Sequence, residues 1–250
     1  MLYDILIKEG LKFEDGKIVI PKTIKKIKFD IGIAIEAIHT EDWLNKEPDD
    51  LLVFGFEALP YCIDETKKYF SQPISKWKQN NTINTSWLNN QFIIVPVALA
   101  NKSNQTVDFY VTNNNIGCSS LLKPSNIAER DGISLKNIIS VPVFKLSDFF
   151  ELLPLDSIEY IEYIKVDVQG IDLEVIKSGG EYISDKVVFV TMEAETTYYE
   201  NATDNNLKNM VDYMNSIGFS RINHTNCSDP TFLNRKFQHL AHSIYISQFN

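Results

Sequence analysis

Short apolar runs alternate along this chain with segments in which apolar residues recur every three or four positions. The runs have the length of buried strands, and the segments between them have the spacing of amphipathic helices. Strands separated by helices are typical of a mainly parallel sheet with helices on both faces. Core strands are expected at residues 27–31, 51–57, 92–99, 160–166 and 187–193. Helices are expected at residues 35–46, 61–70, 146–152, 173–178 and 205–217.

The two ends of the chain depart from this pattern. Near the start, a turn at residues 15–16 leads into an alternating run, which predicts a peripheral hairpin or an edge strand. Near the end, runs at residues 219–224 and 242–247 flank a turn-rich segment and predict a terminal hairpin with an antiparallel strand. We therefore expect an extension at residues 1–25 and one domain at residues 26–250.

An insertion follows the third predicted strand. Residues 107–111 alternate as a strand does, and residues 112–120 are polar and contain a glycine. This loop suits either contact with a ligand or the solvated tip of a surface hairpin.

Composition narrows the class of protein. A chain of 250 residues with 44% hydrophobic residues suits one folded α/β domain. Its net charge of -9 argues against a nucleic-acid partner, because binding to phosphates relies on clustered Lys and Arg. No apolar run approaches the roughly 18 residues of a membrane span, the first residues do not form a signal peptide, and the three cysteines lack a CxxC pair. We therefore expect a cytoplasmic protein with reduced thiols.

Three of the predicted strands end at an acidic residue. Asp167 follows a buried strand and comes just before a glycine turn and a helix, while Asp30 and Glu57 end two earlier strands. The carboxyl ends of parallel strands meet at one edge of a sheet, where ligands of open α/β folds bind. The three acids are therefore expected to share one crevice.

The segment after the first strand indicates the kind of ligand. Gly32 lets the backbone approach a cofactor closely, but Ala34 and Ala37 leave the loop without the further glycines that cradle a pyrophosphate. This disfavours a nicotinamide-dependent oxidoreductase. Glu57 follows at roughly the distance, about 20 residues, at which an acid binds ribose hydroxyls. A cationic nucleoside cofactor without phosphates, such as S-adenosylmethionine, fits this combination. Alternatively, Asp30 caps a helix, Gly32 only makes a turn, and Glu57 is solvated.

The sequence around Asp167 resembles a known family. IKVDVQG at residues 164–170, followed by EVIKSG at residues 174–179, is similar to the K-I-D-V-E-G-x-E … V-L-x-G signature of FkbM-type S-adenosylmethionine-dependent methyltransferases. The resemblance implies a Rossmann-like class I fold, with a seven-stranded, mainly parallel sheet and an antiparallel last strand. It also implies O-methylation of a hydroxyl on a sugar or glycoconjugate. Gln169 replaces the glutamate of the signature, which leaves open a non-catalytic module that only binds the cofactor.

The resemblance also implies roles for single residues. Asp30 and Gly32 are expected to contact the methionine portion of the cofactor, and Glu57 its ribose. Ala98 and Leu99 are expected beside the adenine, and Asp167 beside the transferred methyl group. Substrate contacts are expected from Ser119 and Ser120. Independently of the resemblance, Tyr198 lies in an aromatic run after the fifth predicted strand, which suits either stacking on a sugar or a packed loop.

The group that removes the proton from the acceptor is left open by the sequence. Asp167 suits this role because a carboxylate attracts a sulfonium cation and accepts a proton. It could act alone, or it could share a Mg²⁺ or Mn²⁺ ion with Glu193, since both acids are expected at neighbouring strand ends. His224, at the end of the sixth predicted strand, is a further candidate base or a packed imidazole.

Overall fold

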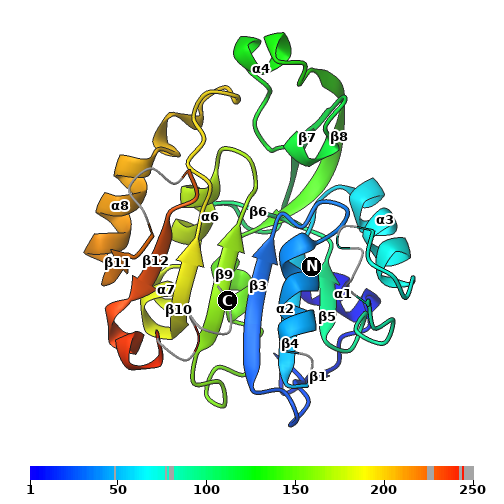
Figure 1. Ribbon diagram of the computed structural model, residues 1–250, viewed down its shortest axis with the longest axis vertical. Coiled ribbons are helices and arrows are strands. Elements are labelled where there is room, and N and C mark those ends of the chain that lie inside the picture. Colours follow the sequence, from blue (N-terminus) through cyan, green and yellow to red (C-terminus); the bar gives the residue numbers. More distant parts are fainter. Residues whose placement is uncertain (48, 77, 79–81, 224–227, 242–243, 245–250) are drawn as a thin grey trace.

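A seven-stranded sheet forms the centre of the molecule (Figure 1). The computed structural model describes residues 1–47, 49–76, 78, 82–223, 228–241 and 244. In spatial order the strands are β11 (Phe219–Arg221), β12 (Thr231–Asn234), β10 (Val187–Thr191), β9 (Ile161–Val166), β3 (Lys26–Ile31), β4 (Leu51–Phe56) and β5 (Phe92–Val95). β12 is antiparallel to both of its neighbours, and the other pairs are parallel. The Rossmann-like α/β fold predicted from the sequence is confirmed.

The last strands lie differently from the expected terminal hairpin. β11 forms where it was expected, but its partner is β12, which follows Pro230 and inserts between β10 and β11. Four residues are too few to show a clear alternation, so this strand was missed. Of the predicted strand at residues 242–247, all but residue 244 lie outside the described residues.

All five expected helices are present with shifted ends. They are α2 (Ile38–Lys46), α3 (Pro60–Phe70), α5 (Leu146–Phe150), α6 (Asp172–Ser178) and α8 (Leu207–Ser216). Shorter helical segments that were not expected are α1 (Leu2–Lys8), α4 (Asn126–Arg130), α7 (Glu181–Lys186), η1 (Ile116–Cys118), η2 (Ala202–Asp204) and η3 (Arg235–Leu240). None of the helices in the described part of the chain is long and apolar enough to cross a membrane.

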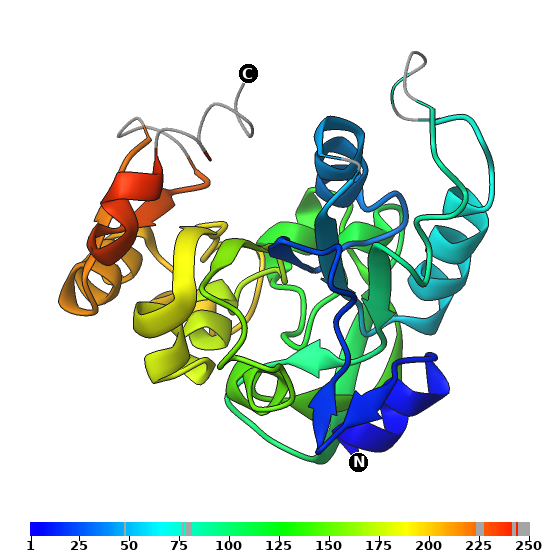
Figure 2. The same ribbon diagram turned by 90° about the horizontal axis from the view of Figure 1, so that it is seen from below.

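Both faces of the sheet are buried, and β4, β5 and β10 accordingly appear in the sequence as continuous apolar runs, whereas buried charged residues interrupt β3 and β9. Along β4, Leu52 and Phe54 join one core cluster, and Val53 joins the other. On the first face, the ring centroids of Phe54 and Phe149 of α5 lie 5.0 Å apart. On the second face, α2 contributes Trp43. Figure 2 shows α1 and α2 on opposite sides of the sheet.

The segment before the main sheet includes a hairpin whose strands form no hydrogen-bonded pairs with the described strands of that sheet. Among the residues that the structure describes, β1 (Phe13–Glu14) pairs with β2 (Lys17–Ile18) alone, around a turn in which Asp15 and Gly16 have positive φ. Leu2 and Leu6 of α1 and Ile18 of β2 are buried in the same core cluster as the strands of the main sheet. The extension therefore packs onto the core, and the boundary after residue 25 remains a prediction.

A second, three-stranded sheet holds the insertion. Its order is β6 (Ala98–Leu99), β8 (Leu135–Phe144) and β7 (Gln105–Thr112). The single strand expected at residues 92–99 is wrong: β5 ends at Val95, and Pro96, which has no N–H to donate, precedes the turn toward β6. The expected strand at residues 107–111 is confirmed within β7. Figure 1 shows β7, β8 and α4 rising beyond the carboxyl ends of β3 and β9.

Candidate active site

A cavity of about 560 Å³, including the open space at its mouth, lies at the carboxyl ends of β3, β4 and β9. Its walls are mostly apolar and carry Glu57 and Asp167, two of the three acids that are expected to share one crevice. The lining residues are Ile31, Gly32, Ala34, Phe56, Glu57, Ala58, Leu59, Cys62, Val97, Ala98, Leu99, Phe109, Ile116, Gly117, Ser119, Leu121, Asp167, Val168 and Ile171.

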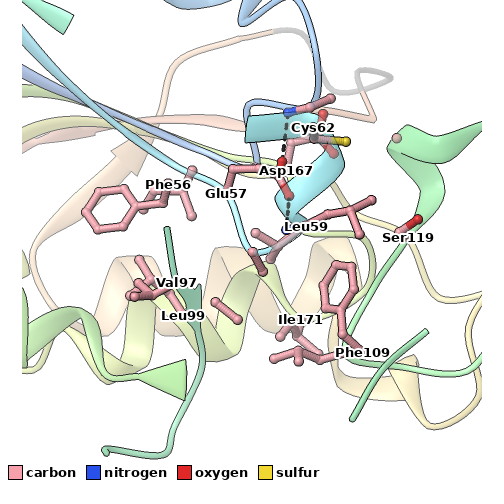
Figure 3. A pocket seen from close by; sticks show the side chains of 18 of the residues that line it. Phe56, Glu57, Leu59, Cys62, Val97, Leu99, Phe109, Ser119, Asp167 and Ile171 are labelled. Atoms are coloured by element: carbon pink, nitrogen blue, oxygen red, sulfur yellow. Dashed lines mark hydrogen bonds between the residues drawn. The ribbon is translucent and has the colours of Figure 1, made fainter. Parts of the chain in front are cut away.

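Glu57 is the buried acid of the cavity wall (Figure 3). Its Oε1 accepts a hydrogen bond from the backbone N–H of Leu59 at 2.8 Å, and its Oε2 accepts one from Ala34 at 3.0 Å. Burial raises the pKa of Glu57 to about 7, and these backbone donors limit the rise. Each carboxylate oxygen keeps a second lone pair, so the group can accept two further hydrogen bonds from a ligand.

Gly32 holds the ends of β3 and β9 together. The backbone N–H of Asp167 donates to the carbonyl of Ile31 at 2.8 Å, and Gly32 has a φ of +85°. A Cβ at Gly32 would lie 1.9 Å from the carbonyl oxygen of Asp167. Only glycine permits this close approach. The backbone at Gly32, which forms part of the cavity wall, is therefore held in a fixed position relative to the backbone of Asp167, whose carboxylate lies at the mouth of the cavity.

The loop after β3 takes a glycine-like path without extra glycines. Ala34 and Ala37 have positive φ values of 51° and 45°. Such a conformation costs an alanine about 1–2 kcal/mol. The hydroxyl of Thr66 in α3 lies within hydrogen-bonding distance of the carbonyls of Ala34 and Ile35, which holds the loop against α3.

Asp30 does not line the cavity. Its Oδ2 accepts hydrogen bonds from the backbone N–H of Thr40 at 3.1 Å and from the Thr40 hydroxyl at 2.7 Å. Burial raises the pKa of this carboxyl group. Asp30 therefore anchors the first turn of α2, as in the alternative of a helix-capping acid, and its contact with a cofactor stays a prediction.

The apolar part of the cavity includes both residues expected beside the adenine. Ala98 and Leu99 lie on β6. Figure 3 shows Phe56, Val97 and Leu99 on one side of Glu57. Phe109 of β7 completes the apolar wall, and its alternation within an insertion was too general a signal to identify it as a cavity residue.

Two carboxylates converge on one amide at the mouth of the cavity. Nε2 of Gln169 donates to Oδ1 of Asp167 at 2.6 Å and to Oε2 of Glu193 at 2.9 Å. Oε1 of Gln169 accepts a hydrogen bond from the hydroxyl of Tyr199 at 2.7 Å. The sequence indicated Gln169 only as a departure from the family signature, and it gave no sign that Tyr199 contacts it.

A buried cation and a further buried acid lie near this amide. Nζ of Lys165 is 3.5 Å from Oδ2 of Asp167. Burial lowers the pKa of Lys165, but Asp167, Asp229 and Asp172 raise it overall. Burial and the charge of Asp167 raise the pKa of Asp172 to about 7. Burial, with the charges of Asp167 and Asp172, raises the pKa of Glu193 to about 8.

The three residues that are expected to contact the substrate have different surroundings in the structure. Ser119 lines the cavity. Ser120 is buried, and its hydroxyl donates to the carbonyl of Gln169 at 2.7 Å, so it braces the loop that carries the amide. Tyr198 does not line the cavity, and its hydroxyl interacts with Asp131 instead. The candidate base His224 lies outside the described residues.

With the Gln169 amide in this direction, the expected divalent ion does not fit between Asp167 and Glu193. Amide hydrogens of Gln169 already point at one oxygen of each acid, and an amide nitrogen does not bind Mg²⁺ or Mn²⁺. Within the described ranges, no group of three or more His, Cys, Asp or Glu side chains is placed to hold a metal ion.

Comparisons with known proteins give a family match and one similar structure. The model of the methyltransferase FkbM domain matches residues 24–221. A crystal structure of methyltransferase FkbM from Methylobacillus flagellatus KT is similar, with 14% identity and a TM-score of 0.45. The match covers 90% of this chain and 47% of that one, so the chain spans about half the length of this solved relative. No curated protein matches.

Proposed function

The chain belongs to the family of the methyltransferase FkbM domain, and from this premise we propose that it is an S-adenosylmethionine-dependent O-methyltransferase. The acceptor that we propose is a hydroxyl of a sugar or glycoconjugate. One observation carries the proposal: Glu57 and Asp167 line a single, mostly apolar cavity at the carboxyl ends of the strands. This is the edge at which open α/β sheets bind their ligands.

The shape and chemistry of the cavity fit a nucleoside. Apolar side chains of Ala98, Leu99 and Phe56 offer a flat purine a surface away from water. Glu57 has two oxygens that are oriented by backbone donors and can each accept a ribose hydroxyl. Two hydrogen bonds from a ribose would also stabilise the ionised form of a carboxylate whose pKa is raised to about 7 by burial.

Asp167 lies where an acceptor would meet the cofactor. When bound, S-adenosylmethionine supplies an electrophilic methyl group on a sulfonium cation. Oδ1 of Asp167 is held by Gln169, and Oδ2, which lies 3.5 Å from Nζ of Lys165, keeps a lone pair that can accept a hydrogen bond from the acceptor hydroxyl. Asp167 would take the hydroxyl proton as the oxygen gains the methyl group and the bond from that methyl group to the sulfur breaks, leaving a neutral thioether; the proton transfer is worth roughly 10²–10⁴-fold in rate.

The backbone of the site limits the movement of these groups. The N–H of Asp167 is bonded to β3, and Gly32 lies against the carbonyl of the same residue. The acid and the cofactor wall therefore keep a fixed separation without a further loss of entropy on binding. Such positioning contributes about 7–11 kcal/mol to favourable intramolecular reactions.

A methyl-transfer screen tests the proposal. The protein is incubated with radiolabelled S-adenosylmethionine and a panel of nucleotide sugars and oligosaccharides, and label in the acceptor is counted. We expect transfer to at least one hydroxyl of the panel, and the Asp167→Asn variant is the matched control. Binding of S-adenosylmethionine is measured in parallel by isothermal titration calorimetry. Binding without transfer to any acceptor favours the non-catalytic module, and absence of binding refutes the cofactor assignment.

A further inference from the structure

The amide of Gln169 is held from three sides. Its Nε2 donates to Asp167 and Glu193, and its Oε1 accepts from Tyr199, which is buried. The backbone carbonyl of the same residue accepts from Ser120. Gln169 also has a positive φ of 64°, which points to a backbone that its surroundings hold in place.

These contacts fix the direction of the amide. If the amide were turned over, its oxygen would face the carboxylate of Asp167, and both hydrogen bonds from Nε2 to Asp167 and Glu193 would be lost. In the observed direction, both hydrogens of Nε2 meet acceptors and Oε1 meets the hydroxyl of Tyr199. Asp167 and Glu193 are therefore drawn together by one neutral donor.

A divalent ion between two carboxylates performs the same task. A Mg²⁺ ion would have to approach Oδ1 of Asp167 and Oε2 of Glu193 to about 2.0–2.1 Å. That space lies along the two hydrogen bonds of Nε2, which are 2.6 Å and 2.9 Å long. The ion and the amide hydrogens therefore cannot occupy this space together. Nε2 cannot bind the ion, because an amide nitrogen has no free lone pair.

We propose that Gln169 is a positioning residue that takes the place of a bridging divalent ion between Asp167 and Glu193, so that this site orients its acids without metal. The proposal rests on the proposed function only in treating Asp167 as the acid of the active site. It predicts that a single exchange of amide for carboxylate converts the pair into a metal site.

Gln169→Glu is the direct test. The new side chain has nearly the same shape, but it replaces the shared donor by a third acceptor beside Asp167 and Glu193. Three carboxyl groups that face one another repel each other unless a cation lies between them. Carboxylate oxygens are hard ligands, which suit Mn²⁺. Gln105→Glu, on the exposed edge of β7, adds the same charge away from the cavity and is the matched control.

Mn²⁺ binding is measured by electron paramagnetic resonance and by the shift of the thermal midpoint with MnCl₂, without cofactor or acceptor. We expect one bound Mn²⁺ and a rise in midpoint for Gln169→Glu, and no saturable binding for the wild type or Gln105→Glu. If Gln169→Glu folds only when MnCl₂ is added, this recovery also supports the proposal. Gln169→Ala, which removes the donor without adding charge, should also be stabilised by MnCl₂.

Saturable Mn²⁺ binding by the wild type that disappears in Asp167→Asn would contradict the proposal. So would a folded Gln169→Glu protein that binds no Mn²⁺. Methyl transfer by the wild type should be unchanged by EDTA, and loss of transfer in EDTA would also refute the metal-free orientation. Because Mn²⁺ binding is read without S-adenosylmethionine, failure here is distinguishable from failure of the methyltransferase assignment.

Discussion

Gly32→Ala tests whether the backbone contact between β3 and β9 sets the geometry of the site. The added Cβ would lie 1.9 Å from the carbonyl oxygen and 2.8 Å from the carbonyl carbon of Asp167. These are backbone atoms, so no flexible side chain can move aside. The loop after β3 and the residue that we propose as the base must separate.

The cost has three sources. The φ of +85° at this position is strained for alanine by about 1–2 kcal/mol. Separation weakens the 2.8 Å hydrogen bond from the N–H of Asp167 to Ile31, which contributes about 1 kcal/mol. Overpacking of a tight site adds about 1–3 kcal/mol. We expect Gly32→Ala to lower the free energy of unfolding by about 3–6 kcal/mol in total.

Gly218→Ala is the matched control because its φ is +95° and no atom lies within 4 Å of the added Cβ. It should cost only the strain, about 1–2 kcal/mol. Urea unfolding followed by circular dichroism measures both variants, and titration calorimetry compares their affinity for S-adenosylmethionine. Equal loss of stability in the two variants, with unchanged affinity, would refute the reasoning.

Three further substitutions test single groups of the site. Asp167→Asn should lower methyl transfer by at least about 100-fold with an unchanged circular dichroism spectrum, because it removes the proton acceptor; unchanged turnover would show that the residue is only structural. Glu57→Gln should weaken S-adenosylmethionine binding by at least about tenfold in calorimetry, because an amide cannot accept on both sides; equal affinity would argue against a ribose contact. Burial and Asp167 raise the pKa of Asp172 from 3.8 to about 7, so this carboxyl stabilises the fold below pH about 4 and the stabilisation is lost as the pH rises through about 7. As the pH rises from about 4 to about 7, the free energy of unfolding of Asp172→Asn should therefore rise relative to that of the wild type, by up to about 4 kcal/mol in urea unfolding. A difference between the two proteins that does not change with pH would contradict the raised pKa.

The core of the fold could be predicted from the sequence because both faces of the sheet are covered. Continuous apolar runs at β4, β5 and β10 indicate buried strands without knowledge of distant contacts. Charged residues interrupt β3 and β9, but each of these strands ends next to an acid. The short elements α7 and β12 have too few residues to show a period. The expected strand at residues 92–99 failed because the transfer of β6 to a second sheet depends on its pairing with β8, far along the chain.

The candidate site could be predicted only where position along a strand decides the role. Glu57 and Asp167 line the cavity because of where their strands end. Asp30 ends a strand in the same way, yet its carboxylate is taken by Thr40, ten residues later. The bridge at Gln169 depends on Tyr199, thirty residues away, and such a contact leaves no local pattern.

The most direct test of the central claim is a crystal structure of the protein with S-adenosylhomocysteine. The account predicts that the ribose hydroxyls donate to Glu57, the adenine lies against Ala98 and Leu99, and the sulfur faces Asp167 across the mouth of the cavity. A ligand bound outside this cavity, or one whose sulfur points away from Asp167, would contradict it.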